Sequence, residues 1–369
     1  MNIVIFGLSI SSAWGNGHAT LLRGLFRALH EQGHSVDFFE RDTPYYAAHR
    51  DVTSVPFARL HLYADWNQNL ATAREALSRA DVGMVTSYCA DGVAASALVL
   101  EAKLPRAIFY DMDAPVTLSR LARGETVPYL PPDGLGDFDL VLSYTGGRAL
   151  DELRTKLKAR RAATLYGWVD PAVHHRVDSC AKFAADLSYL GTYSADRQAA
   201  LDNLLIEPAR RLKSRSFIVA GAMYPNPQSW PENCRYLEHV APPDHATFYS
   251  SSALTLSVTR GDMAAMGYCP SGRLFEAAAC GTAVLSDFWE GLDTFFEPGR
   301  QILIASDSSD AVAAITKDRA SLEEIGASAR ERVLDCHTAE IRARRFIELA
   351  QNPSDEHHEL GQLCMSEGH

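Results

Sequence analysis

The chain has 369 residues, of which 47% are hydrophobic and 22% charged, and its formal net charge is −11 at pH 7. This length allows two domains with cores of their own, and the composition is that of a globular protein. The acidic balance argues against a nucleic-acid partner, because proteins that bind DNA or RNA usually present a basic surface. The chain lacks a membrane-spanning apolar stretch and a basic region before the first apolar run, so we expect a cytoplasmic protein without a signal peptide.

The seven cysteines are scattered along the chain and form no C-x-x-C pair. Their spacing and odd number favour reduced thiols over a disulfide framework or a zinc site. The sequence shows no clear cluster of metal ligands, and we expect none.

The first half of the chain alternates between apolar strands and amphipathic helices. Residues 2–8 form a continuous apolar run, which is typical of a parallel strand buried on both faces. Residues 18–33 carry apolar side chains at helical spacing and end in a glycine, as expected of a helix. Further strands are expected at 34–42, 57–64, 81–88, 105–113 and 137–147, and helices at 70–80, 90–102 and 148–157.

A second series of the same kind begins near residue 185. It comprises expected strands at 216–225, 253–261, 282–296 and 301–306, and expected helices at 197–212, 271–281, 308–318 and 322–350. Repeated strand–helix units predict doubly wound parallel sheets, and therefore an α/β protein. We expect domains at 1–170 and 171–350, followed by a mobile tail at 351–369. Because such sheets bind ligands beyond the carboxyl ends of their strands, the residues that follow strands are candidates for a site.

The turn "WGNGH" at residues 14–18 follows the first strand. It contains two glycines and a histidine, whereas a structural turn needs only one glycine. Gly15 and Gly17 permit a positive φ and a close approach of a ligand to the backbone. The start of the next helix offers free N–H groups to an anion, although the third glycine of a dinucleotide-binding loop is missing. His18 could act as a general base or a ligand contact, whereas the structural alternative is a histidine that caps the helix.

Asp111 and Asp113 follow the strand at 105–113 in a D-x-D pattern. Such a pair can hold a metal–diphosphate, but the pattern is short and Pro115 indicates a rigid turn. We favour hydrogen bonding to a polyhydroxylated substrate and count both residues as candidate catalytic groups. A solvated loop is the alternative.

The most informative stretch is "YCPSGRLFEAAACGTAVLSDFWEGL" at residues 268–292. Ser271 and Gly272 open a helix whose N-terminus favours phosphate, and Arg273 supplies a planar fork of donors. Glu276, one turn further on, can present a carboxylate to ribose hydroxyls. The alternative is an amphipathic core helix without a site. The next loop after a strand holds Glu290, Gly291 and Leu292.

Within this stretch, "FEAAACGTAVLSD" resembles the nucleotide-sugar signature of GT-B glycosyltransferases, with Ala283 where that family usually has proline. Together with "WGNGHAT", "YDMDAPVTL", "YLGTYSADR" and "DTFFEPGRQILIA", it makes the chain most similar to the CgeB-like, spore-maturation-type family, which is glycosyl transferase group 1-like. The similarity covers roughly residues 1–345. It implies a GT-B fold in which two Rossmann-like parallel-sheet domains face a central cleft. The first domain would bind the acceptor and the second an NDP-sugar.

The resemblance also implies roles for individual residues. Glu276 would bind the nucleotide ribose, and Gly191 and Thr192 would lie beside the diphosphate. Tyr268 stands where retaining relatives carry the first glutamate of an E-x7-E motif, which is a departure from the family pattern. The candidate donor-binding residues are Gly15, Asn16, Gly17, Gly191, Thr192, Arg197, Arg260, Tyr268, Ser271, Gly272, Arg273, Glu276, Glu290, Gly291 and Leu292.

The resemblance thus implies transfer of a sugar from a UDP-, GDP- or dTDP-sugar to an unidentified small-molecule or glycan acceptor, without a required metal. The stereochemistry stays open, because His18 would be the base of an inverting enzyme but a donor contact in a retaining one. Tyr45, Tyr46 and Tyr129 are candidate acceptor contacts, or else buried aromatic residues. Two alternatives remain, an NDP-sugar 2-epimerase-like enzyme and a nucleotide-sugar-binding protein without turnover.

Overall fold

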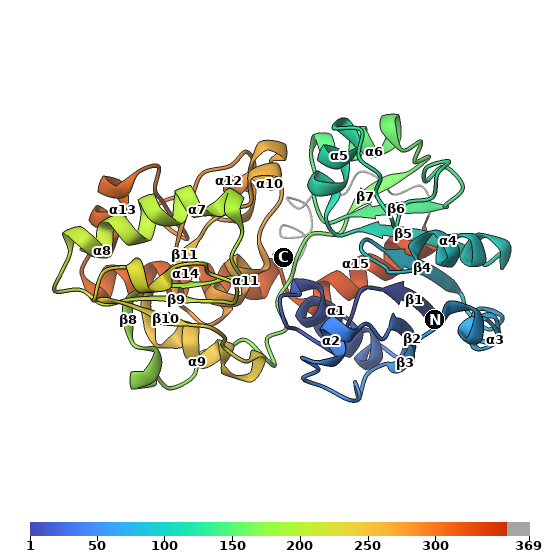
Figure 1. The fold of residues 1–369 in the computed structure, drawn as a ribbon, viewed down its shortest axis with the longest axis horizontal. Coiled ribbons are helices and arrows are strands. Elements are labelled where there is room, and N and C mark those ends of the chain that lie inside the picture. Colours follow the sequence, from blue (N-terminus) through green and yellow to red (C-terminus); the bar gives the residue numbers. More distant parts are fainter. Residues whose placement is uncertain (353–369) are drawn as a thin grey trace, which may run out of the picture. The chain divides into compact units, whose positions relative to one another are not determined.

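The computed structural model describes residues 1–352 and consists of two compact units, each built on a parallel sheet (Figure 1). The first unit comprises Met1–Tyr166 and the helix that begins at Ala339, and the second comprises Gly167–Thr338. The expected domains therefore need one correction, because residues 339–351 lie in the first unit and not in the second. Of the tail expected at 351–369, residues 353–369 lie outside the described residues, and Gln351 is the last residue of α15.

Within the described residues, the first unit contains a seven-stranded sheet in the order β3-β2-β1-β4-β5-β6-β7, with all neighbours parallel. The strands are β1 (Asn2–Gly7), β2 (Ser35–Arg41), β3 (Arg59–Tyr63), β4 (Val82–Thr86), β5 (Arg106–Asp111), β6 (Leu140–Ser143) and β7 (Ala162–Thr164). The helices are α1 (Gly17–Glu31), α2 (Pro44–Ala47), α3 (Trp66–Leu77), α4 (Gly92–Glu101), α5 (Ala114–Ala122), α6 (Arg148–Lys156) and α15 (Ala339–Gln351). The strand order reverses between β1 and β4, which is the point where open α/β sheets bind ligands.

Helix α15 packs beside α1, as Figure 1 shows, although the two helices are far apart in the sequence. The side chain of Gln32 donates to the carbonyl of Glu340 over 3.2 Å. Nε of Arg106 donates to the carbonyl of Ala350 over 2.7 Å, so both ends of α15 are tied to the first unit. The expected single helix at 322–350 is therefore two helices, separated at residues 337–338.

The second unit repeats the topology of the first with a six-stranded sheet, β10-β9-β8-β11-β12-β13, within the described residues. Its strands are β8 (Ala185–Leu190), β9 (Phe217–Ala220), β10 (Cys234–Leu237), β11 (Ser252–Ser257), β12 (Ala283–Ser286) and β13 (Leu303–Ile304). The helices are α7 (Ala195–Leu201), α8 (Glu207–Arg211), α9 (His245–Ser250), α10 (Gly261–Met266), α11 (Gly272–Ala279), α12 (Leu292–Phe295), α13 (Ser308–Ile315) and α14 (Arg319–Cys336). A π-helical turn, η2 (Asp202–Ile206), joins α7 to α8, and short 3-10 turns lie at η1 (Ala181–Phe183), η3 (Pro227–Ser229) and η4 (Pro242–Asp244).

Both sheets are buried because their central strands are almost wholly apolar. Every residue of β4 and β12 is buried, in keeping with parallel strands that are covered on both faces. Within residues 1–352, every helix is too short or too polar to span a bilayer.

The free cysteines among the described residues are Cys89, Cys180, Cys234, Cys269 and Cys280. These five agree with the expectation of reduced thiols.

Candidate functional site

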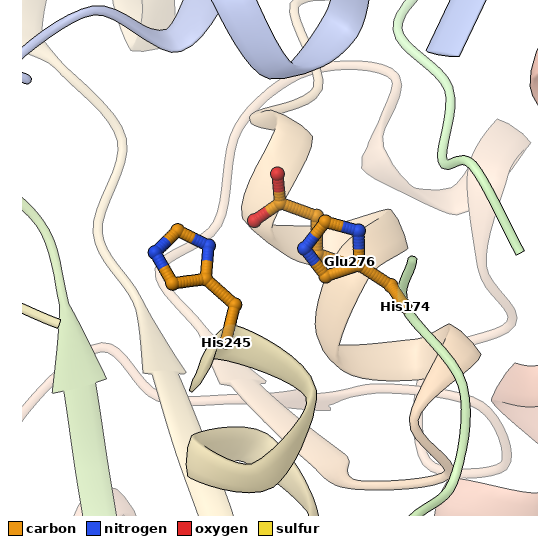
Figure 2. Close-up of side chains that lie close together, drawn as sticks. All are labelled: His174, His245 and Glu276. Carbon is orange, nitrogen blue, oxygen red and sulfur yellow. The ribbon is translucent and has the colours of Figure 1, made fainter. Parts of the chain in front are cut away.

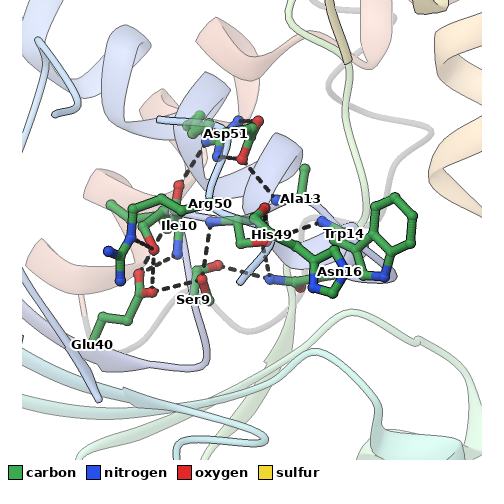
Figure 3. Close-up of polar contacts among 12 residues, drawn as sticks. Ser9, Ile10, Ala13, Trp14, Asn16, Glu40, His49, Arg50 and Asp51 are labelled. Atoms are coloured by element: carbon green, nitrogen blue, oxygen red, sulfur yellow. Dashed lines mark hydrogen bonds and ion pairs between the residues drawn. The ribbon is translucent and has the colours of Figure 1, made fainter. Parts of the chain in front are cut away.

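The loop after β1 closes around a buried carboxylate, that of Glu40 on β2 (Figure 3). Oε2 of Glu40 accepts the backbone N–H groups of Ile10 at 2.7 Å and Ser11 at 3.0 Å. Its Oε1 accepts the hydroxyls of Ser9 and Ser11. A buried carboxylate is tolerated when hydrogen bonds replace its lost hydration, and this one is supplied by the loop itself. The amides of Ile10 and Ser11 are therefore occupied by the protein.

The turn at residues 14–18 uses its two glycines differently. Gly15 has a φ of +60°, and a Cβ there would lie 3.1 Å from the Tyr45 hydroxyl, so this position needs glycine. A Cβ on Gly17 would meet nothing within 4 Å, and its φ is not positive, which corrects the expected need for a second glycine. Asn16 caps α1, because its Oδ1 accepts the N–H of His18 over 3.0 Å. That N–H group is thus taken by the cap, and the donor-binding role of this turn stays a prediction.

His18, Asp113 and Ser87 come together beyond the carboxyl ends of β4 and β5. Nε2 of His18 lies 2.9 Å from Oδ2 of Asp113, and the Ser87 hydroxyl donates to the same oxygen over 3.0 Å. If Nε2 carries the proton that faces Asp113, the lone pair of the imidazole is on Nδ1. Within residues 1–352 this Nδ1 is buried and has no hydrogen-bond partner. A histidine oriented by a carboxylate in this way is suited to accept a proton.

Asp111 and Asp113 are in different environments although they are two residues apart. Asp111 is fully buried, and its Oδ1 accepts the backbone N–H of Asp113 over 2.9 Å. Burial, followed by the charge of Asp113, raises the pKa of Asp111 to about 7. Asp111 therefore shapes the turn that presents Asp113 to His18, and a direct substrate contact by Asp111 stays a prediction.

The tyrosines expected at the acceptor site also differ in exposure. Tyr129 is 2% exposed, and its hydroxyl forms a 2.7 Å hydrogen bond with that of Thr117, as in a core residue. Tyr45 is 48% exposed and packs edge-on against Tyr46. Burial raises the pKa of Tyr46 to about 12. The structure therefore leaves Tyr45 as the tyrosine of this group that is open to a ligand.

In the second unit, the loops after β8 and β9 approach each other backbone to backbone. A Cβ on Gly221 would lie 2.0 Å from the carbonyl oxygen of Gly191, and Gly221 has a φ of +144°. A Cβ on Gly191 would lie 2.6 Å from Nη2 of Arg273. Gly221 therefore requires glycine, and the absence of a side chain at Gly191 lets the end of β8 lie against the guanidinium of Arg273.

Arg273 and Arg197 place buried positive charge at the end of β8. The guanidinium of Arg273 lies 4.7 Å from the ring centre of Tyr189, and its Nε donates to the carbonyl of Leu190. Nη2 of Arg197 donates to the carbonyl of Thr192, and burial lowers the pKa of Arg197. In the described part of the chain, Nη1 of Arg273 and Nε of Arg197 are buried without a hydrogen-bond partner. Buried donors usually have partners, so these two are suited to an anionic ligand.

The other expected phosphate contacts are Arg260, Ser271 and Gly272. Nε of Arg260 is also buried without a hydrogen-bond partner within residues 1–352, and it lies 3.5 Å from Oδ2 of Asp196, which accepts the N–H of Gly261 over 3.0 Å. Ser271 precedes α11 without a side-chain capping bond, so neither it nor Gly272 is held by such a bond. Their role at the phosphate stays a prediction.

Tyr268 and the loop at 290–292 pack tightly together. The N–H of Tyr268 donates to the carbonyl of Glu290 over 2.6 Å, and Tyr268 has a φ of +47°. A Cβ on Gly291 would lie 2.4 Å from the Tyr268 ring, which explains the glycine. Leu292 is fully buried, whereas Glu290 is exposed. The structure therefore supports Glu290 over Leu292 as a residue that a ligand can reach.

Glu276 on α11 lies with two histidines that the sequence analysis did not identify, His174 and His245 (Figure 2). One ligand atom from each of the three lies within 4.8 Å of the others. The Tyr249 hydroxyl donates to Oε2 of Glu276 over 3.2 Å, and burial lowers the pKa of His174. The histidines come from separate parts of the chain, and no local motif marks them.

Comparisons with known proteins bear on the class of this protein. Residues 197–348 match a protein family described as glycosyl transferase-like. An alpha-glucosyltransferase in complex with UDP-glucose and DNA containing an abasic site aligns with a TM-score of 0.69 and 13% identity, over 95% of this chain and 99% of that one. Sucrose-phosphate synthase from Thermosynechococcus elongatus aligns with a TM-score of 0.68 and 15% identity, over 95% and 98%. Anabaena HepE in complex with UDP and glucose aligns with a TM-score of 0.67 and 11% identity, over 95% and 100%.

A search of curated protein sequences found no match. The structural alignments confirm the expected GT-B fold of two Rossmann-like domains. The match of residues 197–348 to a glycosyl transferase-like family supports the expected enzyme class, a glycosyltransferase of GT-B type. The CgeB-like assignment stays a prediction.

Proposed function

We propose that this protein is a cytoplasmic glycosyltransferase that moves a sugar from a UDP-sugar to a hydroxyl group of a small-molecule or glycan acceptor. The glycosyl transferase-like domain supports the reaction, and structural neighbours in complex with UDP or UDP-glucose favour UDP over GDP or dTDP. The observation that carries the proposal is the buried guanidinium of Arg273, whose Nη1 has no partner within the described residues.

In this proposal the diphosphate binds where β8 ends. Nη1 of Arg273 and Nε of Arg197 would each gain the acceptor that they lack within residues 1–352. The N-terminus of α11 adds a favourable dipole for the same negative charge. Glu276 would accept hydrogen bonds from the ribose hydroxyls.

Fixed positive groups of this kind stabilise the charge that develops on the leaving UDP, so turnover would need no metal ion. In the first unit, Asp113 orients His18 over 2.9 Å and would stabilise the imidazolium that forms when His18 takes the proton of the acceptor hydroxyl. That role belongs to an inverting reaction. In a retaining reaction His18 would contact the donor instead.

Release of UDP from a panel of UDP-sugars, with and without candidate acceptors, tests the proposal. His18→Ala should lower the acceptor-dependent rate by about 10²–10⁴-fold, the usual contribution of a general base. The affinity for UDP should stay within a few-fold of the wild-type value if His18 acts as the base.

The matched control is His30→Ala, which removes an exposed histidine from the same helix. Full activity of His18→Ala would contradict the assignment. Conversion of the donor to an isomeric UDP-sugar in the absence of acceptor would favour an epimerase.

A further inference from the structure

The cluster of His174, His245 and Glu276 brings three side chains of the second unit to one point (Figure 2). His174 lies in the segment between β7 and β8, His245 is the first residue of α9, and Glu276 is in the middle of α11. The ligand atoms of the three lie within 4.8 Å of one another. In Figure 2 the imidazole of His174 and the carboxylate of Glu276 lie on one side of the group and the imidazole of His245 on the other.

The two imidazoles have unused nitrogen atoms in the protein interior. His174 is 4% exposed, and neither of its ring nitrogens has a hydrogen-bond partner within residues 1–352. Nε2 of His245 lies 3.1 Å from the carbonyl oxygen of Val240, which can only accept, so this nitrogen carries the proton. The lone pair of His245 is therefore on Nδ1, which is also buried and unpartnered among the described residues.

This arrangement of His245 is the one that metal-binding histidines adopt. Such histidines donate the N–H of one nitrogen to a carbonyl or carboxylate, which fixes the ring and directs the other nitrogen to the metal. Glu276 is oriented in a comparable way, because the hydroxyl of Tyr249 donates to its Oε2 over 3.2 Å. Oε1 then remains as the atom for a ligand.

The chemistry of the three groups selects the kind of ion. Two neutral imidazoles and one carboxylate form the protein ligand set of open zinc sites, in which a fourth position is left to water or a ligand. Imidazole suits Zn²⁺, Co²⁺ and Ni²⁺, whereas Mg²⁺ and Ca²⁺ prefer oxygen ligands.

We propose that His174, His245 and Glu276 form a binding site for a divalent transition-metal ion, with Zn²⁺ as the best-fitting ion. Tetrahedral bonds of about 2.0–2.1 Å place the ligand atoms roughly 3.3 Å apart. The distances between the three ligand atoms, now within 4.8 Å, would therefore shorten by about 1.5 Å at most when the ion binds.

One consequence rests on the proposed function. Glu276 cannot bind the metal and the ribose through the same oxygens, so the metal would compete with UDP and would inhibit turnover.

Titration of the metal-free full-length protein with Co²⁺, a spectroscopic substitute for Zn²⁺, tests the site. Binding of one ion per chain should produce the visible absorption of tetrahedral Co²⁺, and Zn²⁺ should displace it. His245→Ala and His174→Ala should each lower the affinity by at least about tenfold, since loss of a second-shell partner alone costs 10–100-fold. Circular dichroism would confirm that each variant is folded.

The control variant is H357A/H358A, which removes two histidines that lie outside the described residues. It should bind Co²⁺ as the wild type does. Lack of Co²⁺ absorption in the wild type would overturn the proposal, as would equal affinity in the folded His174→Ala and His245→Ala variants.

A separate UDP titration in the presence of a chelator distinguishes this proposal from the function above. Binding of UDP without binding of Co²⁺ would overturn the metal site and leave the transferase proposal standing. Binding of Co²⁺ without binding of UDP would support the metal site and contradict the proposed donor site. If both ligands bind and UDP leaves the Co²⁺ affinity unchanged, Glu276 is not shared and the proposed competition is wrong.

Discussion

Replacing Glu40 by alanine should release the loop that leads from β1 to His18. The carboxylate is fully buried and accepts the N–H groups of Ile10 at 2.7 Å and Ser11 at 3.0 Å. A buried N–H that loses its acceptor costs about 1–3 kcal/mol, so the two amides together should weaken the loop by about 4 kcal/mol. The hydroxyls of Ser9 and Ser11 can turn to other partners and add less.

Hydrogen exchange of the amides of Ile10 and Ser11 measures this effect locally. A change of about 4 kcal/mol corresponds to exchange that is roughly 10³-fold faster in Glu40→Ala. Glu40→Gln should show an intermediate effect, because the amide keeps one accepting oxygen. The control is Glu75→Ala, whose side chain is exposed and pairs with Arg79 one turn away. Exchange in Glu40→Ala as slow as in Glu75→Ala would refute the view that the carboxylate holds this loop.

Two further predictions concern buried residues, Asp111 in the first unit and Gly221 in the second. Asp111→Asn should be more stable than the wild type at pH 8, with a difference that shrinks toward pH 4. The folded pKa of about 7 lies above the ordinary value of 3.8, so the folded state loses stability as pH rises through this range. The wild type loses at most about 4 kcal/mol of its free energy of unfolding in this way. Urea unfolding of both proteins at pH 4 and pH 8 measures the difference. An Asp111→Asn variant that is destabilised equally at both pH values would contradict the reasoning. Gly221→Ala should lose at least about 3 kcal/mol or fail to fold, because its Cβ would lie 2.0 Å from the Gly191 carbonyl oxygen. Gly17→Ala, whose Cβ has open space, should keep the wild-type Tm, and equal Tm values for the two variants would show that the contact at Gly221 is not rigid.

Much of the fold could be predicted because its signals are local. The continuous apolar runs of β1 and β4 and the amphipathic pattern of α1 are properties of neighbouring residues. The position of Arg273 and Glu276 on a helix after a glycine-containing loop was likewise readable from a short motif. Such signals locate elements and the residues at strand ends.

The remainder depends on contacts between distant segments. Helix α15 continues the helical pattern of α14, and its return to α1 is set by bonds such as that between Gln32 and Glu340. Glu40 lies in "FFERD", where a charged residue at the end of a strand is expected to be solvated. Only the three-dimensional course of residues 9–11 shows that it is buried and bonded. The same reason hid His174 and His245, which meet Glu276 from different elements.

The central claim is that the second unit binds UDP through Arg273 and Glu276. The most direct test is calorimetric titration of UDP into the wild-type protein and Glu276→Ala, with a chelator present to exclude metal effects. We expect one UDP per chain and an affinity at least about tenfold lower in Glu276→Ala, which corresponds to about 1.4 kcal/mol. Absence of UDP binding by the wild type, or equal affinity in the variant, would contradict the account.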